Sequence, residues 1–501
     1  MIEADRHRPD DLEPPATTEA SIVEQLLEED SAGKIDLSIE QASILALRFN
    51  RDLAVEQLNP VIIGSYELVE RGDFDPEVFA DLEFRQEKAS EIDRGTGTRF
   101  DVESDRAAGS AGVRQTLPTG TDVELSVSQT RETSNRTPEQ QDARLGLTAT
   151  QQLLRGSGVA VNLVRVRQAE IDTKVSQYEL RGFTEALLAE VESTYWRCVL
   201  AEQRISIFEQ SLAFARQQMR ELEQRIELGD LPSIEAAAAK AEIARREQEL
   251  IDAQSELAAT RFRLLRLINP PAFRRGQETH PELNLVSAAR IKVGPLDDLP
   301  ERLLLAEQSR PDLAEARLRL EQDRLETIVT RNGLLPRLEV FIALGKTGFD
   351  NRFDRSFQKL EQDDSYDFAA GLSVSQPLDN RSARGLNRAA YAIRQQSAAA
   401  VENLRQLIGL DVRLAAIELE RARQQIDASA VTAELQQQTV AAEEERLNVG
   451  AGTALQVAQA QRDLLEANIA EVESIVAYRI ALIELYVAEG SLLSRRGIEF
   501  D

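Results

Sequence analysis

Residue types that could carry out acid–base, nucleophilic or metal chemistry are few in this chain of 501 residues. There are two histidines, His7 in a polar stretch and His280 near a proline-rich stretch, and a single cysteine, Cys198. A His-based catalytic triad or a His-rich zinc site is therefore close to excluded. One cysteine forms neither an intramolecular disulfide nor a CxxC metal pair. We predict no catalytic residue, no cofactor and no metal site.

The charged residues show no catalytic or nucleic-acid-binding pattern. Glu443, Glu444 and Glu445 are consecutive in a helical stretch, where such runs usually form a solvated face. No glycine-rich phosphate loop precedes a predicted helix. The formal net charge of -27 leaves no excess of Lys or Arg to displace counterions from phosphates, so no nucleic-acid partner is expected. Two interpretations of this charge stay open, solubility and an acidic channel lining.

The helices and strands that would position any site are expected in two copies with the same order. Asp52–Ala54 returns as Asp312–Ala314, and Gly229 returns as Gly450. Each copy is predicted to contain a medium helix, alternating segments, a very long helix, a glycine-marked tip and a returning helix. This order predicts an internal duplication.

Heptad rows predict long coiled-coil helices. The medium helices are expected at about Ser38–Glu70 and Pro300–Thr330, and the long helices at about Val159–Leu228 and Ser382–Val449. At 1.5 Å per residue each long helix spans on the order of 100 Å and needs lateral packing. Apolar residues recur at every seventh position, which is typical of coiled coils: Val191, Cys198, Ile205, Leu212, Met219 and Ile226, then Val412, Leu419, Ile426, Ala433, Val440 and Leu447. Cys198 is therefore interpreted as a small core residue.

Between the medium and long helices the apolar period changes to two. Apolar and polar residues alternate over 78–85, 123–128, 145–150, 338–344 and 372–375. Strands with one apolar and one polar face fit an outer-membrane barrel, and also a half-buried soluble sheet. Aromatic residues gather around these strands as in an interfacial girdle, which favours the membrane: Phe74, Phe79, Phe84, Phe100, Phe341, Phe349, Phe353, Phe357, Tyr366 and Phe368.

An extra segment at 113–130 has no counterpart in the second copy. The turn Leu117–Gly120 precedes its alternating residues, which predicts an added hairpin, inside a barrel wall or above it. Two pairs of strands leave open edges that lipid does not tolerate, so the membrane interpretation requires several copies of the chain.

Apolar segments of the length needed for membrane helices are missing. No stretch approaches the roughly 20 apolar residues of a transmembrane helix, and Met1–Arg6 begins no signal peptide. This fits either a cytosolic protein or a mature chain whose signal was replaced by an initiator Met. A β-barrel would insert without an apolar helix.

The joint order of these elements resembles the TolC-like outer-membrane efflux protein family (outer membrane factors) over about 450 residues. Strands ending in Gln151–Gly156 and Gln376–Asp379 each lead into a long helix, and the tips read Arg225–Gly229 and Arg446–Gly450. The resemblance implies a mainly α chain with a transmembrane β part. Three copies would form a 12-stranded β-barrel in the outer membrane and a long coiled-coil helical barrel in the periplasm.

The function implied by the resemblance is that of a passive exit duct of a tripartite efflux or type I secretion system. The implied partners are two further copies, a periplasmic adaptor protein, an inner-membrane pump reached through the adaptor, and outer-membrane lipid. The implied organisation has an equatorial belt formed near Ile22–Leu27, by the linker and by the C-terminal segment. The parts are a polar tail at 1–36, a first repeat at 37–269, a Pro-rich linker at 270–299, a second repeat at 300–489 and a C-terminal tail at 490–501.

The resemblance places function at the helical tips. Contacts with the adaptor would fall on Arg225, Leu228, Gly229, Arg446, Val449 and Gly450, although both glycines are also ordinary helix C-caps.

The family commonly lines its closed aperture with two Asp residues, three apart, and the matching positions here are Gln456 and Gln459. Rings of Gln constrict a pore but bind cations less well than carboxylate rings. Glu235, which matches Gln456 in the first copy, would supply charge instead. All three also fit a solvated helix face.

Alternatives from other classes are a soluble coiled-coil scaffold and, ranked lower, a periplasmic adaptor. A scaffold explains the charge and the heptads but not strands at equivalent points of both copies. An enzyme is the least favoured class. Nothing in the sequence selects among drugs, metal ions and proteins as cargo.

Overall fold

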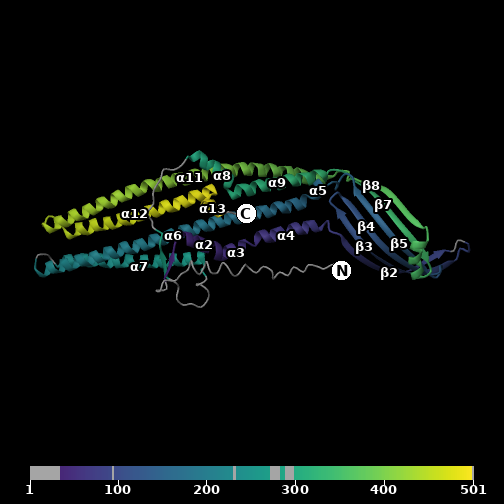
Figure 1. Ribbon diagram of the computed structural model, residues 1–501, viewed down its shortest axis with the longest axis horizontal. Coiled ribbons are helices and arrows are strands. Elements are labelled where there is room, and N and C mark those ends of the chain that lie inside the picture. The colour runs from purple at the N-terminus through teal and green to yellow at the C-terminus, as the bar shows by residue number, and fades with distance from the viewer. Residues whose placement is uncertain (1–33, 93–94, 230–232, 271–281, 288–297, 499–501) are drawn as a thin grey trace. The chain divides into compact units, whose positions relative to one another are not determined.

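The computed structural model describes residues 34–92, 95–229, 233–270, 282–287 and 298–498 (Figure 1). The predicted belt segment Ile22–Leu27 and most of 270–299 lie outside these residues. The chain divides into two compact units. Unit 1 consists of Met1–Leu58, Tyr178–Leu313 and Asn403–Asp501, and unit 2 of Asn59–Gln177 and Ala314–Glu402.

Unit 1 contains most of two long helical hairpins, whose first helices begin in the residues of unit 2 (Figure 1). Helix α6 (Val164–Glu227) turns back into α7 (Ile234–Ile268), and α11 (Arg381–Asn448) turns back into α12 (Ala454–Glu489). Ion pairs such as Arg216–Glu247, at 2.6 Å, join α6 to α7, and a 2.9 Å hydrogen bond between Ser429 and Ser474 joins α11 to α12. The two predicted long helices are confirmed, except that the short α5 (Val159–Asn162) precedes α6.

The heptad rows pack toward the interior, as predicted. Val191, Cys198 and Val412 are 0% exposed, and Leu212, Met219 and Leu419 are buried as well. Burial, with a smaller effect of the Glu202 carboxylate, raises the pKa of the Cys198 thiol to about 12. Cys198 therefore stays protonated and unreactive at neutral pH, as expected of a core residue.

The medium helices are not continuous, contrary to the prediction. The first is divided into α2 (Ile39–Phe49), α3 (Arg51–Glu56) and α4 (Asn59–Gly72), and the second into α8 (Leu299–Ser309) and α9 (Pro311–Asn332).

The first break of each copy falls at the same point of the repeat. Asn50 is extended, and its side chain accepts from the Leu53 N–H at 2.9 Å as an N-cap and donates to the Leu267 carbonyl at 2.9 Å. In the second copy Pro311 stands at this break and has no N–H to continue α8. Local capping thus overrides the apolar periodicity.

Unit 1 also contains a small two-stranded sheet, which is bonded to α6. Strand β1 (Lys34–Leu37) pairs in parallel with β6 (Glu282–Leu285). The Tyr195 hydroxyl on α6 donates to the Leu37 carbonyl at 2.9 Å and accepts from the Ser287 N–H at 3.1 Å. Tyr195 is fully buried in the apolar core of this unit. The part of the 270–299 linker that the structure describes is thus a strand of this sheet.

Unit 2 contains one antiparallel six-stranded sheet, in the order β2-β3-β4-β5-β7-β8. The strands are β2 (Glu77–Ile92), β3 (Arg99–Leu117), β4 (Thr121–Ser134), β5 (Gln140–Gln152), β7 (Arg337–Asp350) and β8 (Tyr366–Ser375). The extra segment at 113–130 is the part of the β3–β4 hairpin next to its turn. It lies within the sheet, between β2 and β5. The sheet of one chain thus has six strands, whereas a twelve-stranded trimer would take four strands from each chain.

The two faces of the sheet differ sharply in polarity. One row across the apolar face takes one side chain from each strand in register: Val78, Val113, Leu125, Leu147, Leu344 and Phe368. Each of these side chains is at least 41% exposed. The next row, on the opposite polar face, consists of Phe79, Gly112, Ser126, Gly146, Gly345 and Asp367. The sheet therefore has a continuous apolar face, and none of the residues that the structure describes covers it along this row.

An ion pair lies across the glycines of the polar face. Arg144 binds Asp367 in a forked arrangement, with Nη2 to Oδ2 at 2.8 Å and Nε to Oδ1 at 3.1 Å. A Cβ atom at Gly345 would lie only 2.0 Å from the Asp367 carboxylate, so a side chain at this position would displace the ion pair.

The helix α10 (Phe353–Gln362), which the sequence analysis missed, packs on the apolar face against the last residues of β7 and against β5. Its Ser356 is 0% exposed and bonds to Gln129, and a Cβ at Gly348 would clash with the α10 backbone. The spacing of Phe353, Phe357 and Leu360 was the available helical signal.

The aromatic girdle is only partly supported. Tyr366 and Phe368 share the apolar face, but Phe79, Phe341 and Phe349 alternate onto the polar face. No helix in the described ranges is long and apolar enough to cross a membrane.

Candidate functional site

The tips of the two helical hairpins have the same local structure. Gly229 and Gly450 follow α6 and α11 with φ of 85° and 75°, a left-handed conformation that glycine adopts without strain. The residue before each glycine is a large, exposed apolar side chain, Leu228 at 77% and Val449 at 75% exposure. The two tips lie at the same end of unit 1 (Figure 1), and near them Arg462 of α12 pairs with Glu242 of α7 at 3.6 Å.

The predicted tip arginines lie one turn before these apolar residues. Arg446 is exposed and pairs with Glu443 at 2.8 Å, and Arg225 is half-buried. Each tip thus combines a left-handed glycine, an exposed apolar side chain and a nearby guanidinium. Arginine is enriched at protein–protein interfaces, and the adaptor contacts at both tips stay a prediction.

The predicted aperture residues occupy the first turns of the returning helices. Gln456 and Gln459 are both exposed on α12. Gln456 also closes a capping box, because its side chain accepts from the Thr453 N–H at 3.0 Å while its own N–H donates to Thr453 Oγ1 at 3.3 Å. Glu235 stands in the first turn of α7, and its side chain lies outside what the structure describes.

Thr453 was missed by the sequence analysis, although the spacing Thr-x-x-Gln is a capping-box signal. The capping role of Gln456 is compatible with lining an aperture, which stays a prediction for Gln456, Gln459 and Glu235.

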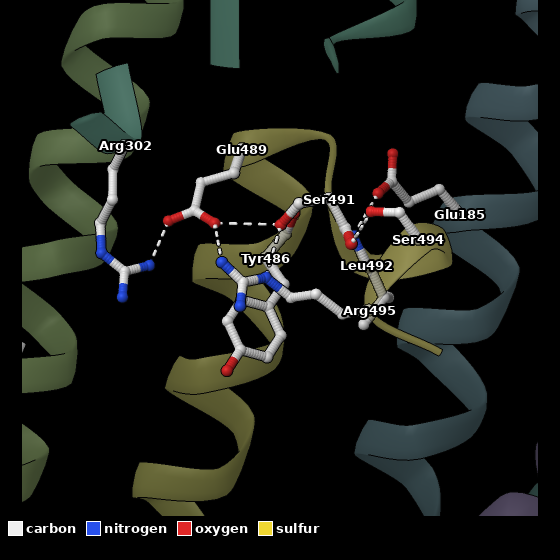
Figure 2. A network of polar contacts seen from close by, with 8 residues as sticks. All are labelled: Glu185, Arg302, Tyr486, Glu489, Ser491, Leu492, Ser494 and Arg495. Carbon is white, nitrogen blue, oxygen red and sulfur yellow. Dashed lines mark hydrogen bonds and ion pairs between the residues drawn. The ribbon is translucent and has the colours of Figure 1, made fainter. Parts of the chain in front are cut away.

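A buried polar network, here called the C-terminal clasp, was also missed (Figure 2). Glu489, at the end of α12, is 0% exposed and pairs with Arg302 of α8. The same carboxylate accepts from the Ser491 hydroxyl at 3.0 Å and pairs with Arg495 at 3.3 Å. Gly490 makes this packing possible, because a Cβ there would lie 2.9 Å from the Arg310 backbone.

The clasp also ties the last helix, α13 (Leu492–Arg495), to α6. Glu185 of α6 accepts from the Leu492 N–H at 2.8 Å, and Glu192 holds Arg496 through two bonds of 2.6 and 2.7 Å. The tail predicted at 490–501 is therefore, as far as residue 498, packed against the long helix.

Replacing Glu185 by glutamine should stabilise the protein at neutral pH. Burial raises the pKa of Glu185, and the Leu492 N–H only partly offsets this. Because this pKa is raised in the folded state, the protonated carboxyl stabilises the folded protein at low pH. This contribution is lost as pH rises through the pKa of the folded state. Glu185→Gln keeps an acceptor for Leu492 without a charge. We expect a gain of about 1 kcal/mol in urea unfolding at pH 8 that shrinks toward pH 5.

Glu190→Gln, on an exposed position of the same helix, is the matched control and should change little. A Glu185→Gln protein that is less stable than the wild type at pH 8 would show that the buried charge is favourable.

Comparison with known proteins identifies the family. A model of the outer membrane efflux protein family matches residues 101–270 and 303–491. The chain belongs to this family. The resemblance to TolC-like outer-membrane efflux proteins is thereby confirmed, and the family description indicates the outer membrane. In the part of the chain that the structure describes, no cluster of His, Cys, Asp and Glu could hold a metal ion.

Solved outer-membrane channels share the fold. The OprN outer-membrane channel matches with a TM-score of 0.66 and 18% identity, covering 90% of both chains. CusC matches with a TM-score of 0.65 and 17% identity, covering 90% of this chain and 91% of that one. The CmeC channel of Campylobacter jejuni matches at 0.64 and 15%, covering 91% and 86%. No curated protein sequence matched.

Proposed function

We propose that this protein is a passive exit duct of a tripartite efflux or type I secretion system. Three copies join their sheets into a closed barrel in the outer membrane, and their helices form a tunnel through the periplasm. A periplasmic adaptor opens the duct at the hairpin tips, and an inner-membrane pump supplies the energy. The chain itself catalyses nothing.

The observation that carries this proposal is the apolar row from Val78 to Phe368. A face that stays exposed in every strand needs an apolar solvent, and lipid is that solvent for a sheet whose other face is polar. Among the described strands β2 and β8 pair on one side only. Closure with neighbouring copies satisfies both edges, which an open sheet in lipid cannot do.

A second apolar stripe on α11 supports assembly from identical chains. While Val412 and Leu419 are buried within the chain, a parallel set at helical spacing is exposed: Leu407, Leu410, Leu414, Ile417, Val431 and Leu435. In the proposed trimer this stripe packs against helices of the next copy, as repeated identical surfaces do in a cyclic assembly.

Two substitutions at adjacent positions test the membrane part of the proposal. Leu125→Arg places a charge on the apolar face and Ser126→Arg places it on the polar face. A charge facing lipid costs about 2–4 kcal/mol near the bilayer midplane. We expect Leu125→Arg to fall well below the wild type in the folded fraction inserted into lipid vesicles, while Ser126→Arg inserts normally.

Leu125 is already 49% exposed within a single chain. A large cost of arginine there therefore reports what surrounds the sheet rather than packing inside the chain. Equal insertion of both variants would contradict the proposal that this face contacts lipid.

A further inference from the structure

We infer that three copies of this chain close a barrel of eighteen strands, and that the β3–β4 hairpin widens the duct beyond what four strands per chain provide. This inference rests on the proposed duct, and it adds a larger cross-section for the cargo. Its basis is the position of the hairpin, the pattern of its two faces and the location of the free edges.

The hairpin is part of the wall along its whole length. Strand β3 pairs with β2 from Glu77–Arg114 to Ile92–Arg99. Strand β4 pairs with β3 from Leu117–Thr121 onward and with β5 from Thr121–Gln151 to Glu132–Gln140. A hairpin standing above the wall would leave β2 bonded to β5, whereas here two complete strands separate them.

The hairpin has the two faces that a wall strand requires. In β4 the large apolar residues Val123, Leu125 and Val127 share the apolar face, and Ser126 and Ser128 share the polar face. A segment with water on both sides would need no such division.

Small residues line the polar face of β3 as well. Ala108, Ser110 and Gly112 alternate with the apolar-face positions Ala111 and Val113. These short side chains take little space from the lumen in the middle of β3, between Arg106 and Arg114 on the same face.

The added hairpin does not change which strands form the two edges of the sheet. These are β2 and β8, as they would be in a sheet without the hairpin. Strand β2 still begins after Pro76, and β8 still ends before Gln376, so the same two edges are available to neighbouring copies. Three sheets of six strands then give eighteen strands. Barrel diameter grows roughly linearly with strand number, so the bore is about 1.5 times that of a twelve-stranded barrel. Barrels of 16–18 strands hold an aqueous channel.

The direct test is electron microscopy of the full-length trimer in detergent, viewed along the barrel axis. We expect eighteen strands. A variant without residues 99–139, in which β2 can pair with β5, should give a barrel of about two-thirds the diameter. A conducting trimer with twelve strands would overturn this inference and leave the proposed duct intact. A chain that forms no membrane trimer would overturn both.

Chemical labelling of the full chain tests the hairpin without relying on the deletion variant. In a Cys198→Ala background, single cysteines replace Ser110, Ala111, Val127 or Ser128, and the protein in lipid vesicles is treated with a membrane-impermeant maleimide. We expect the positions of Ser110 and Ser128 to react at least tenfold faster than those of Ala111 and Val127. Equal reaction at all four positions would place the hairpin in water on both faces and overturn the eighteen-stranded wall.

Discussion

Charged residues at the two hairpin tips should abolish capture of the adaptor. In the variant Leu228→Asp, Val449→Asp, each exposed apolar side chain next to a tip glycine becomes a carboxylate. A few central residues of an interface contribute most of its binding energy, and burying an unpaired carboxylate among them is costly. We expect the Kd for the adaptor to rise at least 100-fold, about 2.7 kcal/mol.

The adaptor is first identified by cross-linking from position 227 in intact cells, and its Kd for purified variants is then measured. Glu227→Gln, at an exposed position beside the same tip, is the matched control and should bind like the wild type. Because Leu228 and Val449 are 77% and 75% exposed, their replacement should leave the assembled channel intact. Unchanged affinity in an intact double variant would remove the tips from the interface.

Truncating the central carboxylate of the C-terminal clasp should have the largest effect on stability. Glu489→Ala removes the carboxylate that pairs with the guanidinium of Arg302, a residue only 8% exposed. Removing one partner of a buried ion pair costs about 3–5 kcal/mol, because the other charge stays buried and has lost that carboxylate. We expect a correspondingly lower urea midpoint for the detergent-solubilised protein, with loss of protection of residues 490–498 from proteolysis.

A double variant separates the cost of the lost Glu489–Arg302 ion pair from the loss of packing. Replacing a buried pair with apolar residues of similar volume is often neutral. Glu489→Leu combined with Arg302→Met should therefore recover most of the lost stability. If the double variant is as unstable as Glu489→Ala, the remaining contacts of Glu489, with Ser491 and Arg495, carry the stabilisation instead.

Sequence periodicity predicts the helical part of this protein well and the sheet less completely. Heptad rows extend over many turns, so residues such as Val191 and Val412 could be assigned to the core directly. The strand β3 was not recognised at its full length, because Ala107–Gly112 contains only small residues and gives no apolar alternation. In the stretch Asp101–Asp105 all three carboxylates stand at odd positions, on the same face as Ala111 and Val113, so the apolar alternation does not extend to this end of the strand. Six strands could therefore not be counted from the pattern alone.

The helix breaks and the clasp escaped the sequence for different reasons. The break at Asn50 and the one before Pro311 have local signals, an N-cap residue and a proline, which the long periodic pattern outweighed. The clasp has no local signal, because Glu185, Arg302 and Glu489 come from three distant helices. Only the packed structure brings them together. The tips were predicted because a glycine that ends a long helix is a local feature.

The measurement that tests the central claim most directly is the mass of the purified chain in solution with and without detergent. The proposed duct predicts particles of three chains that stay soluble only in detergent, because the apolar face from Val78 to Phe368 needs lipid or its substitute. A monomer or dimer that is stable without detergent would contradict the duct and favour a soluble coiled-coil scaffold.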